Sequence, residues 1–117
     1  MFTLTRKDAA DVTVVAVTGK LIGGSENSAL FHDMFKAAIE DGRRKFVVNL
    51  AGAEWANSQG IGMLIGAYTS TSNVEGSLVL ANTTERIQDI LDVTRLNLIF
   101  KSFDSEEEAT AFVDQSG

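Results

Sequence analysis

The chain has 117 residues, the usual size of one compact domain, so it can bury a core but has little room for a second domain. Its formal net charge of −6 disfavours binding to nucleic acid or to an anionic membrane, because an acidic protein repels both. The absence of cysteine excludes disulfides, thiolate metal sites and thiol catalysis. Without an apolar block long enough for a bilayer or an export signal, we expect a single cytoplasmic domain over residues 1–117.

The opening strands are predicted by alternation and by β-branched residues. Residues 2–7 alternate and indicate an edge strand, Ala10–Asp11 a tight turn, and residues 12–18 a second strand that pairs with the first as a hairpin. From Asn27 to about Asp41 the apolar residues recur every three or four positions, which predicts a helix with one buried face. Residues 46–50 form a short apolar run typical of a buried central strand.

The second half of the chain continues this alternation of helices and strands. We expect a loop of about nine residues over 51–59, followed by a second helix from Gly60 to about Asn73. Residues 77–81 are predicted as a buried strand and residues 84–94 as a third helix. Residues 98–102 are predicted as a final short strand.

A closing helix is expected after Ser105, because Ser105 and Glu108 have the spacing of a capping box. The predicted order is therefore β-β-α-β-α-β-α-β-α. After the hairpin, helices and strands alternate, which favours an α/β fold with mostly parallel later strands. We expect one mixed central sheet of about five strands with about four helices.

The segment that can carry chemistry runs from Val47 to Tyr68, where a buried strand leads into a glycine-rich helix start. Ligands and modifications of α/β folds gather at the carboxyl ends of such strands. Ser58 lies at or next to the predicted helix N-terminus. Two interpretations remain open: Ser58 caps the helix, or its hydroxyl is a phosphorylation site, since a helix N-terminus tolerates an anion well.

This segment resembles the signature of STAS domains of the bacterial anti-sigma factor antagonist family. That signature has a buried strand with Asp-Leu, a loop, Asp-Ser-Ser/Ala-Gly, an aliphatic residue, Gly and an apolar helix. Asn49–Leu50 stand at the Asp-Leu position, and residues 57–62 (Asn-Ser-Gln-Gly-Ile-Gly) stand at the second part. The predicted element order matches the family over nearly the whole chain, so the resemblance implies a STAS-like fold.

The resemblance also implies a function in partner switching. In the family, the serine matching Ser58 is phosphorylated by an ATP-binding anti-sigma factor serine kinase. The unphosphorylated domain binds that kinase and frees its sigma factor; phosphorylation breaks the complex, and a metal-dependent serine phosphatase resets it. The chain is then a regulator and not an enzyme, with no cofactor and no metal of its own.

Three residues depart from the family pattern: Asn49 and Asn57 replace aspartates, and Gln59 replaces a small residue. Asparagine still caps helices and forms turns, so the fold tolerates both changes. The aspartate before the serine is a candidate for a role in kinase recognition or phosphoryl transfer. Two alternatives therefore stay open: a non-phosphorylated STAS scaffold subunit of a signalling assembly, and a STAS domain that binds an anion or nucleotide.

The expected partner-binding surface is centred on Ser58 and includes residues from three parts of the chain. Its members are Asn57, Ser58, Gln59, Gly60 and Ile61, with Asn27 and Ser28 from the first helix and Trp55 from the loop. For Trp55 a core-covering position and an exposed anchor for a partner are both open. The sequence leaves open whether the chain forms a homodimer.

Other motifs favour structural interpretations. The glycines from Gly60 to Gly66 do not have the dinucleotide-binding spacing, and close helix packing explains Gly62 and Gly66 better. His32 is the only histidine and has no evident catalytic partner, which disfavours an acyl-transfer triad. Residues 70–72 (Ser-Thr-Ser) are secondary phosphorylation candidates, although helix capping or solvent exposure explains them more simply.

Overall fold

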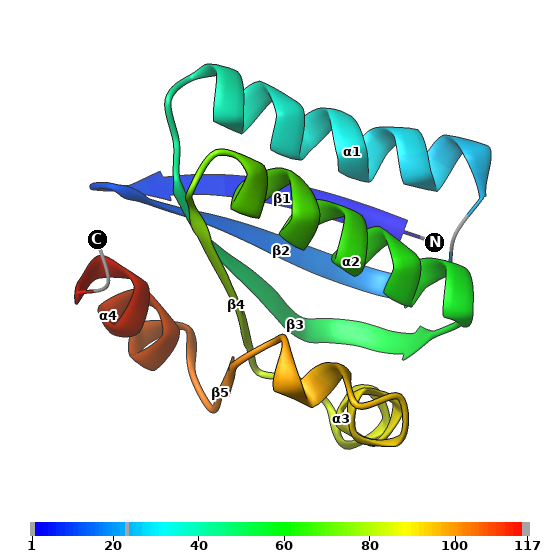
Figure 1. Cartoon of the computed structure of the whole chain (residues 1–117). Helices are drawn as coiled ribbons and strands as arrows, with labels where there is room; N and C mark the ends of the chain where they lie inside the picture. Colours follow the sequence, from blue (N-terminus) through cyan, green and yellow to red (C-terminus); the bar gives the residue numbers. More distant parts are fainter. Residues whose placement is uncertain (1, 23, 116–117) are drawn as a thin grey trace.

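The computed structural model describes residues 2–22 and 24–115 and contains one sheet with helices on both faces (Figure 1). The sheet order is β1-β2-β3-β4-β5, in which β1 and β2 are antiparallel and the later neighbours are parallel. This confirms the predicted α/β class with a hairpin first. The elements are β1 (Phe2–Ala9), β2 (Val12–Leu21), α1 (Ser25–Glu40), β3 (Lys45–Ala56), α2 (Ser58–Asn73), β4 (Ser77–Ala81), α3 (Glu85–Val93), the 3₁₀ turn η1 (Leu96–Leu98), β5 (Ser102–Phe103) and α4 (Glu106–Gln115).

The two faces of the sheet have separate apolar layers, because successive side chains of a strand point to opposite faces. Val15, Val17 and Val48 pack with the core beneath α1, α2 and α3. Val14 and Val47 instead pack with the inner face of α4. α1 and α2 run side by side over the first face (Figure 1). Within the described ranges, no helix combines the length and apolar character needed to cross a membrane.

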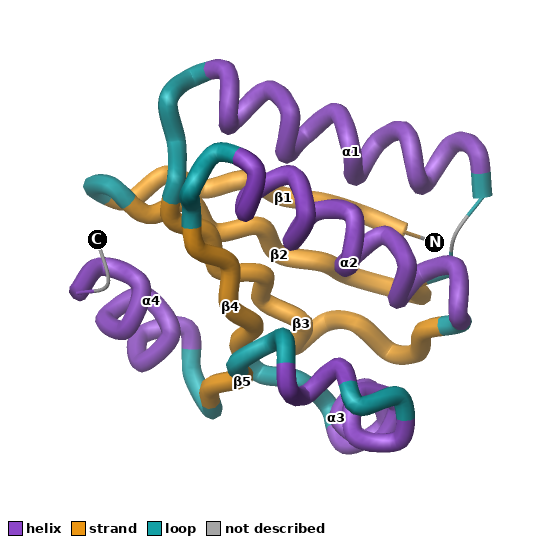
Figure 2. Tube along the Cα trace, viewed as in Figure 1, coloured by secondary structure: helices purple, strands orange, loops and turns teal. Residues whose placement is uncertain are grey.

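The predicted nine-residue loop over 51–59 is wrong, because β3 continues to Ala56. Its second half pairs in parallel with the end of β2, where Trp55 lies opposite Lys20 and Ala56 opposite Leu21. Two register shifts interrupt this ladder, so apolar and polar residues do not alternate regularly along the second half of β3 in the sequence. Only Asn57 separates β3 from α2 (Figure 2). Ser58 therefore lies two residues after the last residue of the central strand, Ala56.

The predicted strand over 98–102 is also misplaced. The 3₁₀ turn η1 ends at Leu98, and the only strand that follows in this region is the short β5, Ser102–Phe103. Leu98 and Ile99 are 80% and 44% exposed, so this apolar run is not a buried strand. Phe100 is the buried member, and its ring meets Tyr68 edge-on with centroids 5.4 Å apart. The apolar residues at 98–100 are therefore accounted for by the burial of the Phe100 ring and not by a buried strand.

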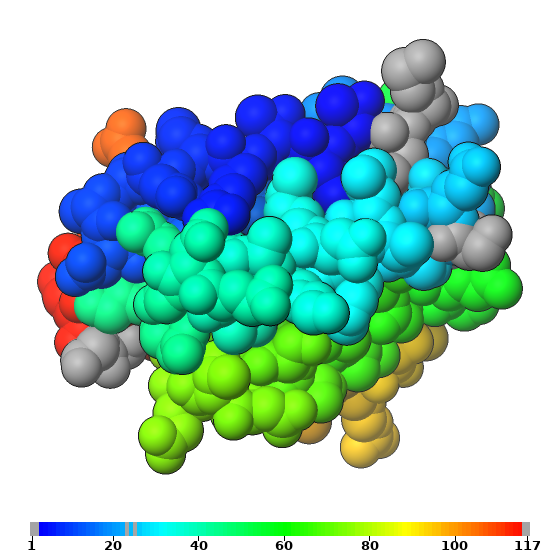
Figure 3. Space-filling view, turned by 90° about the horizontal axis from the view of Figure 1, so that it is seen from above, coloured from blue at the N-terminus to red at the C-terminus, as the bar shows by residue number. Residues whose placement is uncertain are grey.

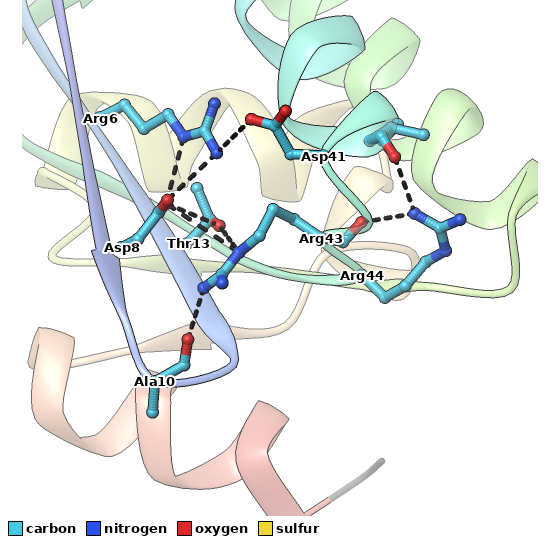
Figure 4. A network of polar contacts seen from close by, with 8 residues as sticks. Arg6, Asp8, Ala10, Thr13, Asp41, Arg43 and Arg44 are labelled. Carbon is cyan, nitrogen blue, oxygen red and sulfur yellow. Dashed lines mark hydrogen bonds and ion pairs between the residues drawn. The ribbon is translucent and has the colours of Figure 1, made fainter.

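A polar network joins the hairpin to the connection between α1 and β3 (Figure 4). Arg43 Nε donates to Thr13 Oγ1 at 2.8 Å, and this buried hydroxyl donates to Asp8 Oδ1 at 3.1 Å. Arg6 bridges Asp8 and Asp41, with N–O distances of 3.1 Å to each. The Arg6 hydrogen bond lowers the pKa of Asp8 despite partial desolvation. The network fixes the start of β2, the end of the strand remote from Ser58.

Candidate functional site

Asn57 caps the N-terminus of α2. Its backbone is extended, with φ −107° and ψ 179°, and its Oδ1 accepts a hydrogen bond of 2.7 Å from the Gly60 N–H. The interpretation of Ser58 as the capping residue is therefore wrong, because Ser58 is the first residue inside the helix. The backbone N–H of Asn57 also donates to the Leu21 carbonyl at 3.2 Å, which ties the helix start to the end of β2.

Gly60 allows α2 to lie directly on β2. A Cβ atom at Gly60 would collide with the backbone carbonyl of Leu21, which cannot retreat without breaking the strand. The next residue, Ile61, is only 4% exposed and belongs to the core. Gly60 and Ile61, both expected on the partner-binding surface, are therefore buried supports that fix the position of Ser58.

The accessible part of the helix start consists of Ser58 and Gln59, both exposed, with the half-buried Asn57 beside them. Among the described residues, no side chain or backbone group is hydrogen-bonded to the Ser58 hydroxyl within the chain. The first turn of α2 carries no acidic residue. The partial positive charge of the helix N-terminus is therefore not neutralised there, and an anion on Ser58 would be stabilised electrostatically.

A groove of about 530 Å³ lies between α1 and α2 and begins beside Ser58. Ser28 of α1 and Gln59 of α2 line it together, so these two predicted surface residues share one face. Asn27 has a different role: its Nδ2 donates to the Ile22 carbonyl at 3.0 Å and holds the connection from β2 to α1. The lining residues are Gly24, Ser28, Phe31, His32, Phe35, Gln59, Gly62, Met63, Gly66, Ala67 and Ser70.

Close packing within the chain does not explain Gly62 and Gly66, so that prediction is wrong. A Cβ atom at either position would find no other group within 4 Å, because both glycines face the open groove. Of the residues that line the groove, only Ser28 and Gln59 were expected at a surface from the sequence. The available signal was the four-residue repeat of Gly62, Gly66 and Ser70, which places all three on one helical face.

Trp55 is 37% exposed and packs with neither apolar layer of the sheet. It lies beside Lys20, Glu54 and Arg86 in an open depression at the carboxyl end of the sheet. Of the two interpretations of Trp55, the structure supports the exposed one over the core-covering one. A large half-exposed aromatic side chain at the same end of β3 as Ser58 is suited to contact a protein partner.

Asn49 does not take part in the surface around Ser58. Its Nδ2 donates to Glu106 Oε1 at 3.0 Å, and its Oδ1 accepts from the Ala51 N–H at 2.9 Å. Lys7 Nζ donates to the other Glu106 oxygen at 2.8 Å. The Lys7 hydrogen bond and, after it, the Asn49 hydrogen bond lower the pKa of Glu106. Asn49 therefore links β3 to α4 on the opposite face of the sheet.

The remaining candidates are explained by their contacts. Thr71 is 1% exposed and its hydroxyl donates to the Ala67 carbonyl at 2.8 Å, so it is inaccessible to a kinase. His32 is exposed on α1, and no described carboxylate lies within ion-pairing distance of its ring.

The chain belongs to the STAS domain family: the family's sequence profile matches residues 4–109. A protein of Thermotoga neapolitana named "Putative anti-sigma factor antagonist TM1081 homolog" is 31% identical over 85 residues, covering 72% of this chain and 75% of that protein. A Thermotoga maritima protein named "Putative anti-sigma factor antagonist" is 28% identical over 85 residues, covering 72% of this chain and 75% of that protein. The chain is therefore an anti-sigma factor antagonist-like STAS domain.

Solved structures confirm the fold. The crystal structure of a putative anti-sigma factor antagonist of Thermotoga maritima superposes with a TM-score of 0.85 at 26% identity, covering 95% of this chain and 94% of that one. The Bacillus cell fate determinant SpoIIAA, solved in its phosphorylated form, superposes with a TM-score of 0.72 at 20% identity, covering 97% and 99%. At this identity the second likeness supports the fold alone.

Proposed function

We propose that this domain binds an anti-sigma factor serine kinase and that phosphorylation of Ser58 switches the complex off. The main observation behind the proposal is that the Ser58 hydroxyl is accessible and does not cap the helix. It is exposed at the first position of α2, and capping is done by Asn57 instead. A residue that is accessible and has no structural task can be modified without damage to the fold.

Phosphorylation requires only an accessible hydroxyl from this chain, because the kinase supplies the ATP site and the base. The Ser58 oxygen attacks the γ-phosphorus of ATP held by the kinase, ADP leaves, and the hydroxyl proton passes to a base that the kinase supplies. The phosphoserine carries a charge of about −1.5 to −2 at neutral pH. Its oxygens can accept hydrogen bonds from backbone N–H groups of the first turn, so the domain stays folded.

The same charge explains why the complex separates. Ser58 and Gln59 are exposed in the free protein and would be covered by a partner that docks on the start of α2. Moving a dianion into such a contact removes its hydration, and the partner has to supply compensating donors. Each loss of about 1.4 kcal/mol weakens binding tenfold, so a few unmatched contacts are enough for a switch.

Two findings support this function. The Thermotoga neapolitana relative that is 31% identical to this chain is named an anti-sigma factor antagonist. In this chain, Asn57 performs the capping that an aspartate would perform, so replacement of the family aspartate leaves the geometry of Ser58 unchanged. The proposal implies a kinase, a serine phosphatase that acts on the phosphorylated form, and a cytoplasmic setting where both meet the domain.

The test is intact-mass spectrometry after incubation with ATP and an anti-sigma serine kinase encoded near this chain. We expect one added phosphate on the wild type and none on Ser58→Ala. Ser72→Ala is the matched control, because Ser72 is exposed near the other end of α2, and it should be phosphorylated like the wild type. Tight binding without any added phosphate would contradict the switch and favour a constitutive scaffold.

A further inference from the structure

The groove between α1 and α2 is free of formal charge in an otherwise acidic protein. Among the described residues that line it, His32 is the only titratable one, and the other ten are apolar, glycine or uncharged polar residues. α2 itself contains no Asp, Glu, Lys or Arg over Ser58–Asn73. Figure 3 shows α1 and α2 exposed next to each other on one face of the molecule.

Charge limits which partner fits this face. Two copies of a chain with net charge −6 repel each other, and the repulsion is weakest where both surfaces are uncharged. Depletion of charge is also what distinguishes the centre of a protein interface from the rest of a surface. The neutral face is therefore electrostatically suited to meet its own copy.

The shape of α2 is self-complementary as well. Gly62 and Gly66 form a recess, because no other group lies within 4 Å of where their Cβ atoms would be. Ile65 projects beside them and is 39% exposed, although it is a large apolar side chain. Ile65 is three residues from Gly62, so the projection and the Gly62 end of the recess are neighbours on the helix surface. The floor of the groove is apolar and consists of Phe31, Phe35 and Met63.

We propose that this face of α2 binds a second copy of the chain in a two-fold symmetric dimer. In an isologous contact each surface meets the same surface of its partner. Ile65 of each protomer enters the recess at Gly62 and Gly66 of the other, and the glycines permit close approach of the two helices. This inference does not depend on phosphorylation, but Gln59 also lines the groove, so the dimer covers the residue next to Ser58.

Sedimentation velocity over a wide concentration range tests the dimer. We expect the wild type to pass reversibly from monomer to dimer as its concentration rises. Ile65→Ser removes the projection and Gly62→Leu fills the recess, and each should raise the dimer dissociation constant at least about tenfold. Leu30→Ser is the matched control, because Leu30 is 49% exposed on α1 but does not line the groove, and it should dimerise like the wild type.

The thermal midpoint of the monomer separates this role from a structural one. Leucine favours a helix more than glycine and finds open space at position 62, so Gly62→Leu should not lower the midpoint. A stable variant that no longer dimerises supports the proposal. A wild type that stays monomeric up to its solubility limit overturns it, as does a Gly62→Leu variant that dimerises like the wild type.

Discussion

Replacing Asn49 with aspartate, the residue found in the family signature, should destabilise this protein. The change removes the amide that donates to Glu106 Oε1 at 3.0 Å and places a second carboxylate against the first. Two unit charges about 4 Å apart repel by about 4 kcal/mol at the effective dielectric constant of about 20 found near protein surfaces. Glu106 is 30% exposed and Lys7 stays bound to it, so screening reduces this value.

Ala51 and Asn82 can still donate to the side chain at position 49, and these hydrogen bonds offset part of the repulsion. We therefore expect a net loss of about 2 kcal/mol in the free energy of unfolding at pH 7. For a domain of this size that loss lowers the thermal midpoint by roughly 6–10 °C. Urea unfolding followed by circular dichroism measures the free energy, and thermal scans measure the midpoint.

The pH dependence identifies the cause. The pKa of Glu106 is lowered in the folded wild type, so this group contributes stability above the pKa of the unfolded chain. That contribution is lost as the pH falls through the lower folded value. In Asn49→Asp the two carboxylates repel only while both are ionised, so the difference between variant and wild type should shrink below about pH 4.

A double variant completes the test. Glu106→Gln in the Asn49→Asp background restores an amide–carboxylate pair with the roles exchanged, and should recover more than half of the lost stability. Equal stability of Asn49→Asp and wild type at pH 7 would refute the reasoning. A loss that is independent of pH and is not recovered by Glu106→Gln would also refute it.

Substitutions at three further positions, two beneath the site and one at the remote end of β2, are tested by urea unfolding. Gly60→Ala should lower the free energy of unfolding by more than about 3 kcal/mol, because its Cβ meets the Leu21 carbonyl; a smaller loss would contradict the close contact. Asn57→Ala should lower it by about 1 kcal/mol through loss of the cap, whereas Asn57→Asp should match the wild type; equal losses would contradict the capping role. Thr13→Val should lower it by about 1–3 kcal/mol, because Arg43 loses a buried acceptor, and an unchanged value would show that the network is dispensable.

The sequence predicted the fold wherever apolar periodicity continued without interruption. The hairpin, α1 and β4 lie at or near their expected positions because their core-facing residues recur with the period of the element. The end of β3 was missed because its partner strand contains register shifts near Gly19, so its pairing depends on a remote segment. The run at Leu98 was misassigned because apolar character alone does not distinguish a strand from an exposed turn.

The site was predicted only in part, for reasons that individual residues show. Ser58 and Gln59 are accessible as expected, but Gly60 and Ile61 are buried by a contact with Leu21 that local sequence cannot reveal. Asn49 and Ser58 both lie in the segment that resembles the family signature. The long β3 instead separates them, and Asn49 contacts α4.

The most direct test of the proposed switch compares the affinity of the anti-sigma serine kinase for the unphosphorylated and the Ser58-phosphorylated protein by isothermal titration calorimetry. The proposal predicts tight binding of the unphosphorylated form and at least about a hundredfold weaker binding of the phosphorylated form, a difference of about 2.7 kcal/mol. Circular dichroism should show both forms equally folded. Equal affinities of the two folded forms would contradict a switch at Ser58.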